Sequence, residues 1–262
     1  MISVDQESFM RRIRKALGHA PDVSRDGREL FPEGPSAEEV QILDRISKRT
    51  DAERHALLEE LIAAGKLINL TVIPVPDLAA ATSTIAGLVD EKVPEWGETK
   101  SVAAWRHPLL ERLNLAEPLG RLHVPLRITA PIDPAADREE EQAARDRQRA
   151  DLIAAFIGVT GADFCMADTA TLVLRNRPGQ PRSAALIPSI HIAVITRDQI
   201  IHDMKELFAL LRWDERFRAE GLSNYMSFIS GPSKTADIEA TMVHGAHGPR
   251  EVHLFIITGP TG

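Results

Sequence analysis

The distribution of apolar residues changes near residue 66 and from there predicts alternating strands and helices. Short runs rich in β-branched residues indicate strands, and longer segments with apolar positions every three or four residues indicate helices. Strands interleaved with helices of roughly 10–20 residues are typical of an α/β fold with a mixed, mainly parallel sheet that is covered on both faces. The strand runs are LINLTVI (67–73), SVAAW (101–105), LHVPLRI (122–128), ADFCMA (162–167), TLVLRN (171–176), SAALIP (183–188), IHIAVI (190–195), YMSFIS (225–230) and VHLFII (252–257).

The same pattern predicts helices between most of these strands. Pro125 lies inside the run 122–128, so that strand is a candidate for an edge of the sheet. The close succession of short strands between 162 and 195 departs from a simple doubly wound order, and we expect a hairpin or an antiparallel edge there. Helices are expected at 77–92, at 107–115, from an Asp133–Pro134 cap to about Ile157, and from Ile200 to Leu211.

The first 64 residues predict helices separated by a loop. Capping-box spacings occur at Ser3–Gln6 and at Ser36–Glu39, and the residues 19–35 between the two helices keep no apolar period. We therefore expect an N-terminal helical extension over 1–64 and an α/β domain over 65–262. The first helix carries a basic cluster, which is either a solvated face or a contact for an anion or a partner, at Arg11, Arg12, Arg14 and Lys15.

Composition and charge exclude several classes of protein. Apolar residues make up 44% and charged residues 26% of the 262 residues, which is the ordinary range for a globular chain. The net charge of −7 argues against a general nucleic-acid binder, and no apolar run is long enough to span a membrane. The single cysteine, Cys165, cannot form an internal disulfide, ligate an iron–sulfur cluster alone or build a paired-cysteine zinc site. We expect a cytoplasmic protein without a metal or cofactor of its own.

The most informative bend is the segment Ser230–Glu239, which follows an apolar strand. Gly231 permits a sharp turn, and Ser233 or Thr235 can cap the short helix that we expect to follow. A helix N-terminus beside Lys234 would bind an anion, and a bend after a strand lies at the usual ligand edge of an α/β sheet. The spacing is not that of a Walker A loop. A plain capped turn with an exposed lysine fits equally well.

Two further bends contain polar residues. Asp168, Thr169 and Thr171 place a carboxylate and two hydroxyls in one tight turn, which either binds a sugar, carboxylate or acyl group or satisfies its own backbone. In the loop His244–Pro249, the glycines and the proline argue against a helical metal site, although His247 could donate a proton. His191 is expected to be a hydrogen-bonded strand residue, and Cys165 a small core residue.

The order of these motifs resembles the LUD-domain family, and within it the lactate utilization C type. The resemblance covers about residues 158–258 and depends on VTGA (159–162), ADTATL (167–172), LIPSIHIAV (186–194), SGPSKTADIE (230–239) and GAHGP (245–249). One difference is that the family usually has Glu-Thr-Gly-Thr-Leu where this chain has Asp168-Thr169-Ala170-Thr171-Leu172. Asp168 reaches one methylene less far than a glutamate would, and Ala170 carries a Cβ where glycine has none.

The resemblance implies a fold similar to CoA transferases and ribose-5-phosphate isomerase. It also implies a role in oxidising L-lactate to pyruvate together with iron–sulfur protein partners. Our first hypothesis is a non-redox subunit of such a complex; the second is a stand-alone isomerase-like or transferase-like enzyme acting on a phosphorylated or carboxylated small molecule. Either would bind a small anionic ligand through Asp168, Thr169, Thr171, Gly231, Ser233, Lys234, Thr235, Asp237, His247 and Gly248.

Overall fold

The computed structural model describes residues 4–18, 33–94, 99–133, 135–221, 225–236, 242–245 and 247–260. By their internal contacts the residues form two units, Met1–Gln41 and Ile42–Gly262. The first unit contains helix α1 (Val4–Ala16) and the start of α3 (Ala37–Ser47). The capping box expected at Ser36–Glu39 is confirmed, since the Ser36 amide donates to Glu39 Oε2 and the Glu39 amide donates to Ser36 Oγ. The box expected at Ser3–Gln6 lies outside the described residues.

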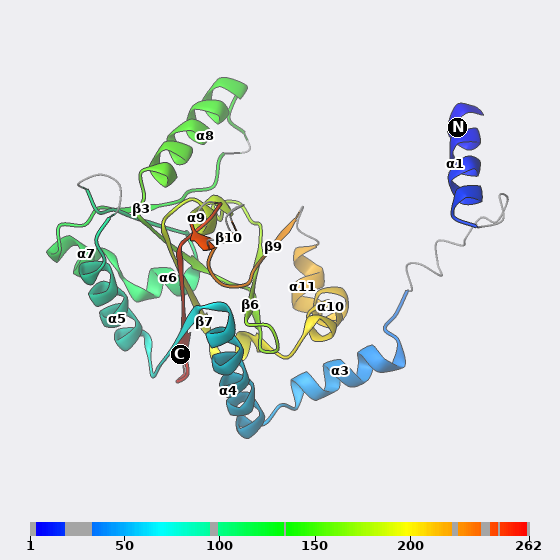
Figure 1. The fold of residues 1–262 in the computed structure, drawn as a ribbon, viewed down its shortest axis with the longest axis horizontal. Helices are drawn as coiled ribbons and strands as arrows, with labels where there is room; N and C mark the ends of the chain where they lie inside the picture. The colour runs from blue at the N-terminus through cyan, green and yellow to red at the C-terminus, as the bar shows by residue number, and fades with distance from the viewer. Residues whose placement is uncertain are drawn as a thin grey trace. The chain divides into compact units, whose positions relative to one another are not determined.

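The second unit is built on a six-stranded sheet in which every neighbouring pair is parallel (Figure 1). The three central strands are almost wholly buried along their length, so both faces of the sheet are covered, as the sequence predicts. The strand with Pro125 before it lies at an edge, also as predicted. In spatial order the strands are β1 (Leu70–Val75), β12 (Glu251–Ile257), β7 (Ile190–Thr196), β4 (Ile157–Gly161), β2 (Val102–Ala104) and β3 (Leu126–Ile128).

A second, mostly antiparallel sheet accounts for the dense strand cluster. The hairpin expected between 162 and 195 is confirmed by the antiparallel pairing of β5 with β6. Alternate side chains of this hairpin face two cores: Cys165 and Leu172 join the main core, whereas Phe164 and Val173 pack with helix α10. The order is β8 (Ile200–Ile201), β5 (Phe164–Met166), β6 (Thr171–Arg175) and β9 (Met226–Ile229). A separate two-stranded hairpin joins β10 (Lys234–Ala236) to β11 (Met242–His244).

The helices follow the predicted order, with some different boundaries; the helix expected from Ile200 begins only at Met204, because Ile200 and Ile201 pair with β5 as a strand. They are α4 (Asp51–Ile68), α5 (Leu78–Glu91), α6 (Pro108–Leu113), α7 (Ala116–Arg121), α8 (Arg138–Ile153), α9 (Ser183–Leu186), the 3₁₀ turn η1 (Arg197–Gln199), α10 (Met204–Trp213) and α11 (Glu215–Glu220).

Three predicted elements are corrected by tertiary packing. The run SAALIP (183–188) forms the short helix α9 rather than a strand, and it packs so closely on β4 that a Cβ on Gly158 would lie 1.9 Å from the Ala184 carbonyl oxygen. Helix α8 is capped by Asp137 rather than Asp133 and ends at Ile153, so Ile157 begins β4 instead. The run LINLTVI (67–73) becomes a strand only from Leu70, because α4 continues to Ile68 and ends at left-handed Asn69.

The boundary between the N-terminal extension and the α/β domain also differs from the predicted one at residue 64. Helix α4 was expected in an extension that ends at residue 64, yet Leu57, Leu58 and Leu61 belong to the main core, and α4 is continuous up to Ile68. A helix that buries its apolar face against the sheet is part of the domain in physical terms. The structural division between the two units therefore falls near residue 41.

A buried ion pair fixes the end of α3 to α10 within the second unit. Glu206 is fully buried, and its Oε1 accepts hydrogen bonds from Arg49 at 2.6 Å and Arg45 at 3.1 Å. Its Oε2 accepts from the amide of His202 at 2.7 Å. Removing one partner of a buried pair leaves the other charge uncompensated, which costs far more than the loss of an exposed pair.

We predict that Glu206→Ala lowers the free energy of unfolding by about 3–5 kcal/mol, because the guanidinium of Arg49 remains buried without its counter-charge. The control is Asp44→Ala, which breaks the exposed pair with Lys48 and should change stability by less than about 1 kcal/mol. Urea unfolding measures both. Equal effects of the two variants would contradict the role assigned to Glu206.

Candidate functional site

Two of the predicted bends meet through neighbouring strands. Leu172 of β6 pairs with Ile229 of β9, and just beyond that pair the hydroxyls of Thr171 and Ser230 lie 2.7 Å apart. The turn before β6 carries Asp168 and Thr169 at the surface, where Thr169 Oγ1 donates to Asp168 Oδ1 at 3.0 Å. The carboxylate turn and the Ser-Gly-Pro-Ser bend therefore share one hydrogen-bonded junction.

The loop His244–Pro249 contacts the bend that begins at Ser230 through Ser233. The Ser233 amide donates to the Pro249 carbonyl at 2.8 Å, and the Gly245 amide donates to the Ser233 carbonyl at 3.1 Å. The hydroxyl of Ser233 accepts from the His247 amide at 3.3 Å. A Cβ added to Gly248 would lie 3.3 Å from the Ser233 Cβ, so the two chains are in close contact. Ser233 thus joins segments that are some fifteen residues apart in sequence.

The segment after Ser233 is a strand, which corrects the expectation of a short helix. Lys234 is exposed and lies opposite His244 in the β10–β11 hairpin. The anion-binding argument from a helix N-terminus therefore does not apply here, and any anion would be held by Lys234 and by loop amides instead. Asp237 lies outside the described residues, as does the side chain of Thr235.

Three left-handed residues shape these bends: Gly231, Ala170 and Gly245, which has φ +83°. Gly231 has φ +74°, and a Cβ at this position would lie 2.4 Å from the carbonyl oxygen of Ile68 at the end of α4. Ala170 has φ +49° although it carries a Cβ. The backbone conformation that glycine favours is thus kept here by alanine, which makes the turn strained.

The bends lie at the amino ends of the parallel strands, not at the carboxyl ends where we expected them. Gly231 contacts Ile68 just before β1, and the amide of Arg250, just before β12, donates to the carbonyl of Ser189, just before β7. The sequence pattern was misleading because the strand before Gly231 is β9, which belongs to the antiparallel sheet.

The carboxyl edge of the parallel sheet contains a separate cavity of about 480 Å³, which sequence reasoning missed. Its walls come from the ends of β2 and β4, the turn after β6, and helix α11. His107, Asp163, Arg177 and Gln180 are among its lining residues. They come from three separate parts of the sequence, and the only sequence signal for them is that each part follows a buried strand.

Within this cavity the charges are paired and the histidine is neutral. Arg177 lies 2.6 Å from Asp163 and 2.7 Å from Glu220. His107 Nδ1 accepts from the Leu109 amide at 3.2 Å, which leaves the ring hydrogen on Nε2. Burial lowers the pKa of His107, only partly opposed by Asp163. The ring can therefore act as a neutral hydrogen-bond donor at pH 7.

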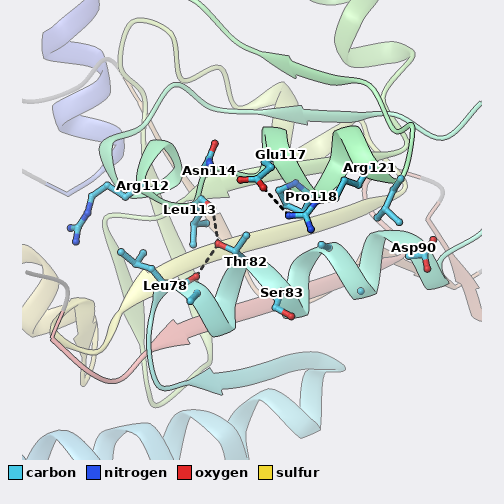
Figure 2. A pocket seen from close by; sticks show the side chains of 14 residues that line it. Leu78, Thr82, Ser83, Asp90, Arg112, Leu113, Asn114, Glu117, Pro118 and Arg121 are labelled. Atoms are coloured by element: carbon cyan, nitrogen blue, oxygen red, sulfur yellow. Dashed lines mark hydrogen bonds and ion pairs between the residues drawn. The ribbon is translucent and has the colours of Figure 1, made fainter.

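A second hollow, of about 710 Å³, is a groove between α5 and the α6–α7 pair. Figure 2 shows Thr82 and Ser83 of α5 on one side and Glu117 and Arg121 of α7 on the other. Thr82 Oγ1 donates to the Leu78 and Leu113 carbonyls, and Arg121 pairs with Glu117 at 3.0 Å. The Thr82–Leu113 contact joins α5 to α6, whereas the Arg121–Glu117 pair lies within α7.

The remaining candidates have structural roles. His191 is a buried strand residue bonded to Thr160 Oγ1 at 2.8 Å, as predicted. Cys165 is fully buried in β5, and burial raises the pKa of its thiol well above the usual range. Among the described residues no three histidine, cysteine or acidic side chains gather as a metal site. None of the helices described is both long and apolar enough to cross a membrane.

Comparison with known families matches the LUD domain over residues 58–257, and the chain belongs to that family. Several relatives carry the name lactate utilization protein C. The protein of Halalkalibacterium halodurans is 30% identical over 64% of this chain and 67% of its own length, and that of Shouchella clausii is 27% identical over 81% and 86%. A crystal structure of a DUF162 family protein from Deinococcus radiodurans aligns with TM-score 0.48 and 19% identity, over 78% of this chain and 98% of that one.

We predict that Gly231→Ala destabilises the protein by more than about 2 kcal/mol, because it combines a left-handed φ with a clash against the Ile68 backbone. Gly87→Ala is the control: it lies in α5 with open space around it and should stabilise by about 0.5–1 kcal/mol. Thermal unfolding of both variants provides the measurement. If Gly231→Ala left the stability of the protein unchanged, this bend would not be held against α4.

We also predict that stability falls as the pH drops below about 6.5. Burial lowers the pKa of His191 to about 3 and also lowers those of His107 and His253, so the unfolded chain binds more protons below its ordinary histidine pKa. His191 alone should contribute a slope of up to about 1.4 kcal/mol per pH unit between these limits. Urea unfolding at a series of pH values tests this. His191→Gln should flatten the slope, whereas a replacement of exposed His55 should not.

Proposed function

We propose that the chain is a non-redox component of a cytoplasmic iron–sulfur complex that oxidises L-lactate to pyruvate, and that it binds a small anionic ligand. The observation that carries this proposal is membership of the LUD family together with relatives named lactate utilization protein C. Oxidation of L-lactate to pyruvate releases two electrons and two protons. In this proposal the electrons pass to centres on the partner proteins.

The division of labour between this chain and its partners follows from its thiol chemistry. Iron–sulfur clusters are held by several cysteine thiolates, and these 262 residues contain one cysteine. Cys165 is buried in the main core, and its raised thiol pKa keeps it protonated, so it is a packing residue. The role left to this chain is to bind and position a ligand or a partner.

The junction of the three bends is the proposed ligand site. It brings the hydroxyls of Thr171 and Ser230 together on one side and the Ser233–His247 contact on the other. Lys234 adds an exposed positive charge next to Ser233. The ammonium group of Lys234 and the hydroxyl hydrogen of Ser233 suit a carboxylate, the group that lactate and pyruvate share. The shorter Asp168 would leave more room there than the family's glutamate.

A second candidate function is a stand-alone isomerase-like or transferase-like enzyme acting on a phosphorylated or carboxylated substrate. The cavity at the carboxyl edge favours it, because ligands of open α/β sheets bind outside the carboxyl ends of the strands. There the neutral His107 would hydrogen-bond a substrate carbonyl, and Asp163, which lines the same cavity, would accept a proton on release from Arg177. In that case the purified chain would turn over its substrate alone.

We predict that deleting the gene abolishes growth on L-lactate, and that the wild-type chain restores growth whereas Lys234→Ala restores it poorly. Lys66→Ala, which removes another exposed lysine, should restore growth fully. The tagged wild-type chain should also co-purify with iron–sulfur proteins. Normal growth of the deletion strain would refute the lactate role, whereas full rescue by Lys234→Ala would refute only the bend site.

A further inference from the structure

Two arginines at the carboxyl-edge cavity converge on one carboxylate from helix α11. Glu220 is the last residue of α11, and its side chain is half-exposed. Its Oε2 accepts from Arg175 Nη1 at 3.1 Å and from Arg177 Nε and Nη2 at 3.2 and 2.7 Å. Arg177 lines the cavity, and Arg175 is buried against the ring of Phe217 in its wall. The two guanidinium groups therefore form a slot for an anion, which the protein's own carboxylate occupies.

Glu220 fills this slot in a way that a free ligand would improve. All of these hydrogen bonds go to a single oxygen, whereas a carboxylate and a guanidinium form their strongest pair through two parallel hydrogen bonds. Ion pairs that water reaches are also weak. Because its side chain is half-exposed, Glu220 can rotate into solvent, whereas the side chain of Arg175 is 4% exposed and stays in place. The slot is therefore open to a competing anion.

The charge balance of the cavity wall fits one negative group. With Glu220 in place, the charges of Arg175 and Arg177 are balanced by Glu220 and Asp163. When Glu220 rotates away, one positive charge is left over, and a ligand with a single negative charge restores neutrality. The other charged lining residues have partners of their own: Arg49 with Glu206, Asp198 with Arg54, and Arg216 with Asp214.

His107 adds a neutral donor to the same cavity. Its ring lies against Gly161 at the end of β4, where a Cβ would lie 3.0 Å from His107 Nε2. Since Nδ1 accepts from the Leu109 amide, the ring hydrogen is on Nε2, and burial, which lowers the pKa of His107, keeps the ring uncharged at pH 7. A neutral N–H recognises a carbonyl or hydroxyl oxygen. The matching ligand therefore carries an acceptor oxygen besides its negative group.

We propose that the cavity binds a small organic acid, with its carboxylate on Arg177 and Arg175 in place of Glu220 and a carbonyl or hydroxyl oxygen on His107 Nε2. Glu220 is then a competing internal ligand, which lowers the apparent affinity according to the fraction of molecules in which it occupies the slot. The volume of about 480 Å³ is sufficient for such a molecule. This inference rests on the cavity of the second candidate function, and it requires neither the lactate role nor turnover.

The test is calorimetric titration of the full chain with pyruvate, with propionate, which lacks the carbonyl oxygen, and with inorganic phosphate. Glu220→Gln removes the competing charge at nearly constant size and should raise the affinity for pyruvate by about tenfold or more. Glu215→Gln is the matched control, because it removes the same charge from an exposed position of α11 and should leave the affinity unchanged. Arg177→Gln combined with Glu220→Gln should abolish the gain.

Two further variants separate the parts of the site. His107→Asn keeps an acceptor for the Leu109 amide but withdraws the Nε2 donor, so it should lower the affinity for pyruvate relative to propionate by about five- to tenfold. Lys234→Ala, in the bend at the amino edge, should leave the affinity for pyruvate and its gain in Glu220→Gln unchanged.

An affinity of Glu220→Gln no higher than that of the wild-type chain would overturn the proposal, and so would an equal gain from Glu215→Gln. Loss of pyruvate binding in Lys234→Ala would place the ligand at the bends instead of the cavity. Phosphate binding as tight as that of pyruvate would refute the assignment to organic acids. Pyruvate binding without turnover would support the cavity site and count only against the stand-alone enzyme.

Discussion

The burial of the central parallel strands on both faces is the constraint on which the rest of this structure depends. β4, β7 and β12 offer no exposed side along most of their length, so their side chains are apolar or satisfied internally. The exceptions include His191, which is bonded to Thr160 on the neighbouring strand, and His253, which is bonded to Glu251; burial lowers the pKa of both histidines and keeps them neutral. Polar chemistry is thereby confined to the two edges of the sheet.

Each edge carries a different set of groups. The amino edge holds the small-residue bends that resemble the family's motifs, connected by Ser233 and closed against α4 by Gly231. The carboxyl edge holds the cavity with His107 and the Asp163–Arg177 pair. The first set suits recognition of a carboxylate by donors at the surface, and the second suits a ligand enclosed among paired charges. The two candidate functions therefore differ in which edge of the sheet binds the ligand.

The antiparallel hairpin connects the two edges. Asp163 at its start lines the carboxyl-edge cavity, and the turn at its other end carries Asp168 and leads to the Thr171–Ser230 junction. A hairpin buried on both sides, with Cys165 facing one core and Phe164 the other, is a rigid link between them. The strained Ala170 sits in its turn, where the surrounding packing maintains a conformation that the residue itself disfavours.

The sequence by itself determined the α/β class, most strands, the hairpin near residue 165, the edge strand beside Pro125 and the burial of His191. These features depend on local periodicity and on residue chemistry, which the chain carries wherever it folds. Only the tertiary structure decided that SAALIP is helical, that the segment after Ser233 is a strand, and that α4 belongs to the domain. It also decided that the bends lie at the amino edge and that His107 meets Arg177 in a cavity. Those outcomes depend on which strands become neighbours, and contacts between residues far apart in sequence leave no periodic pattern along the chain.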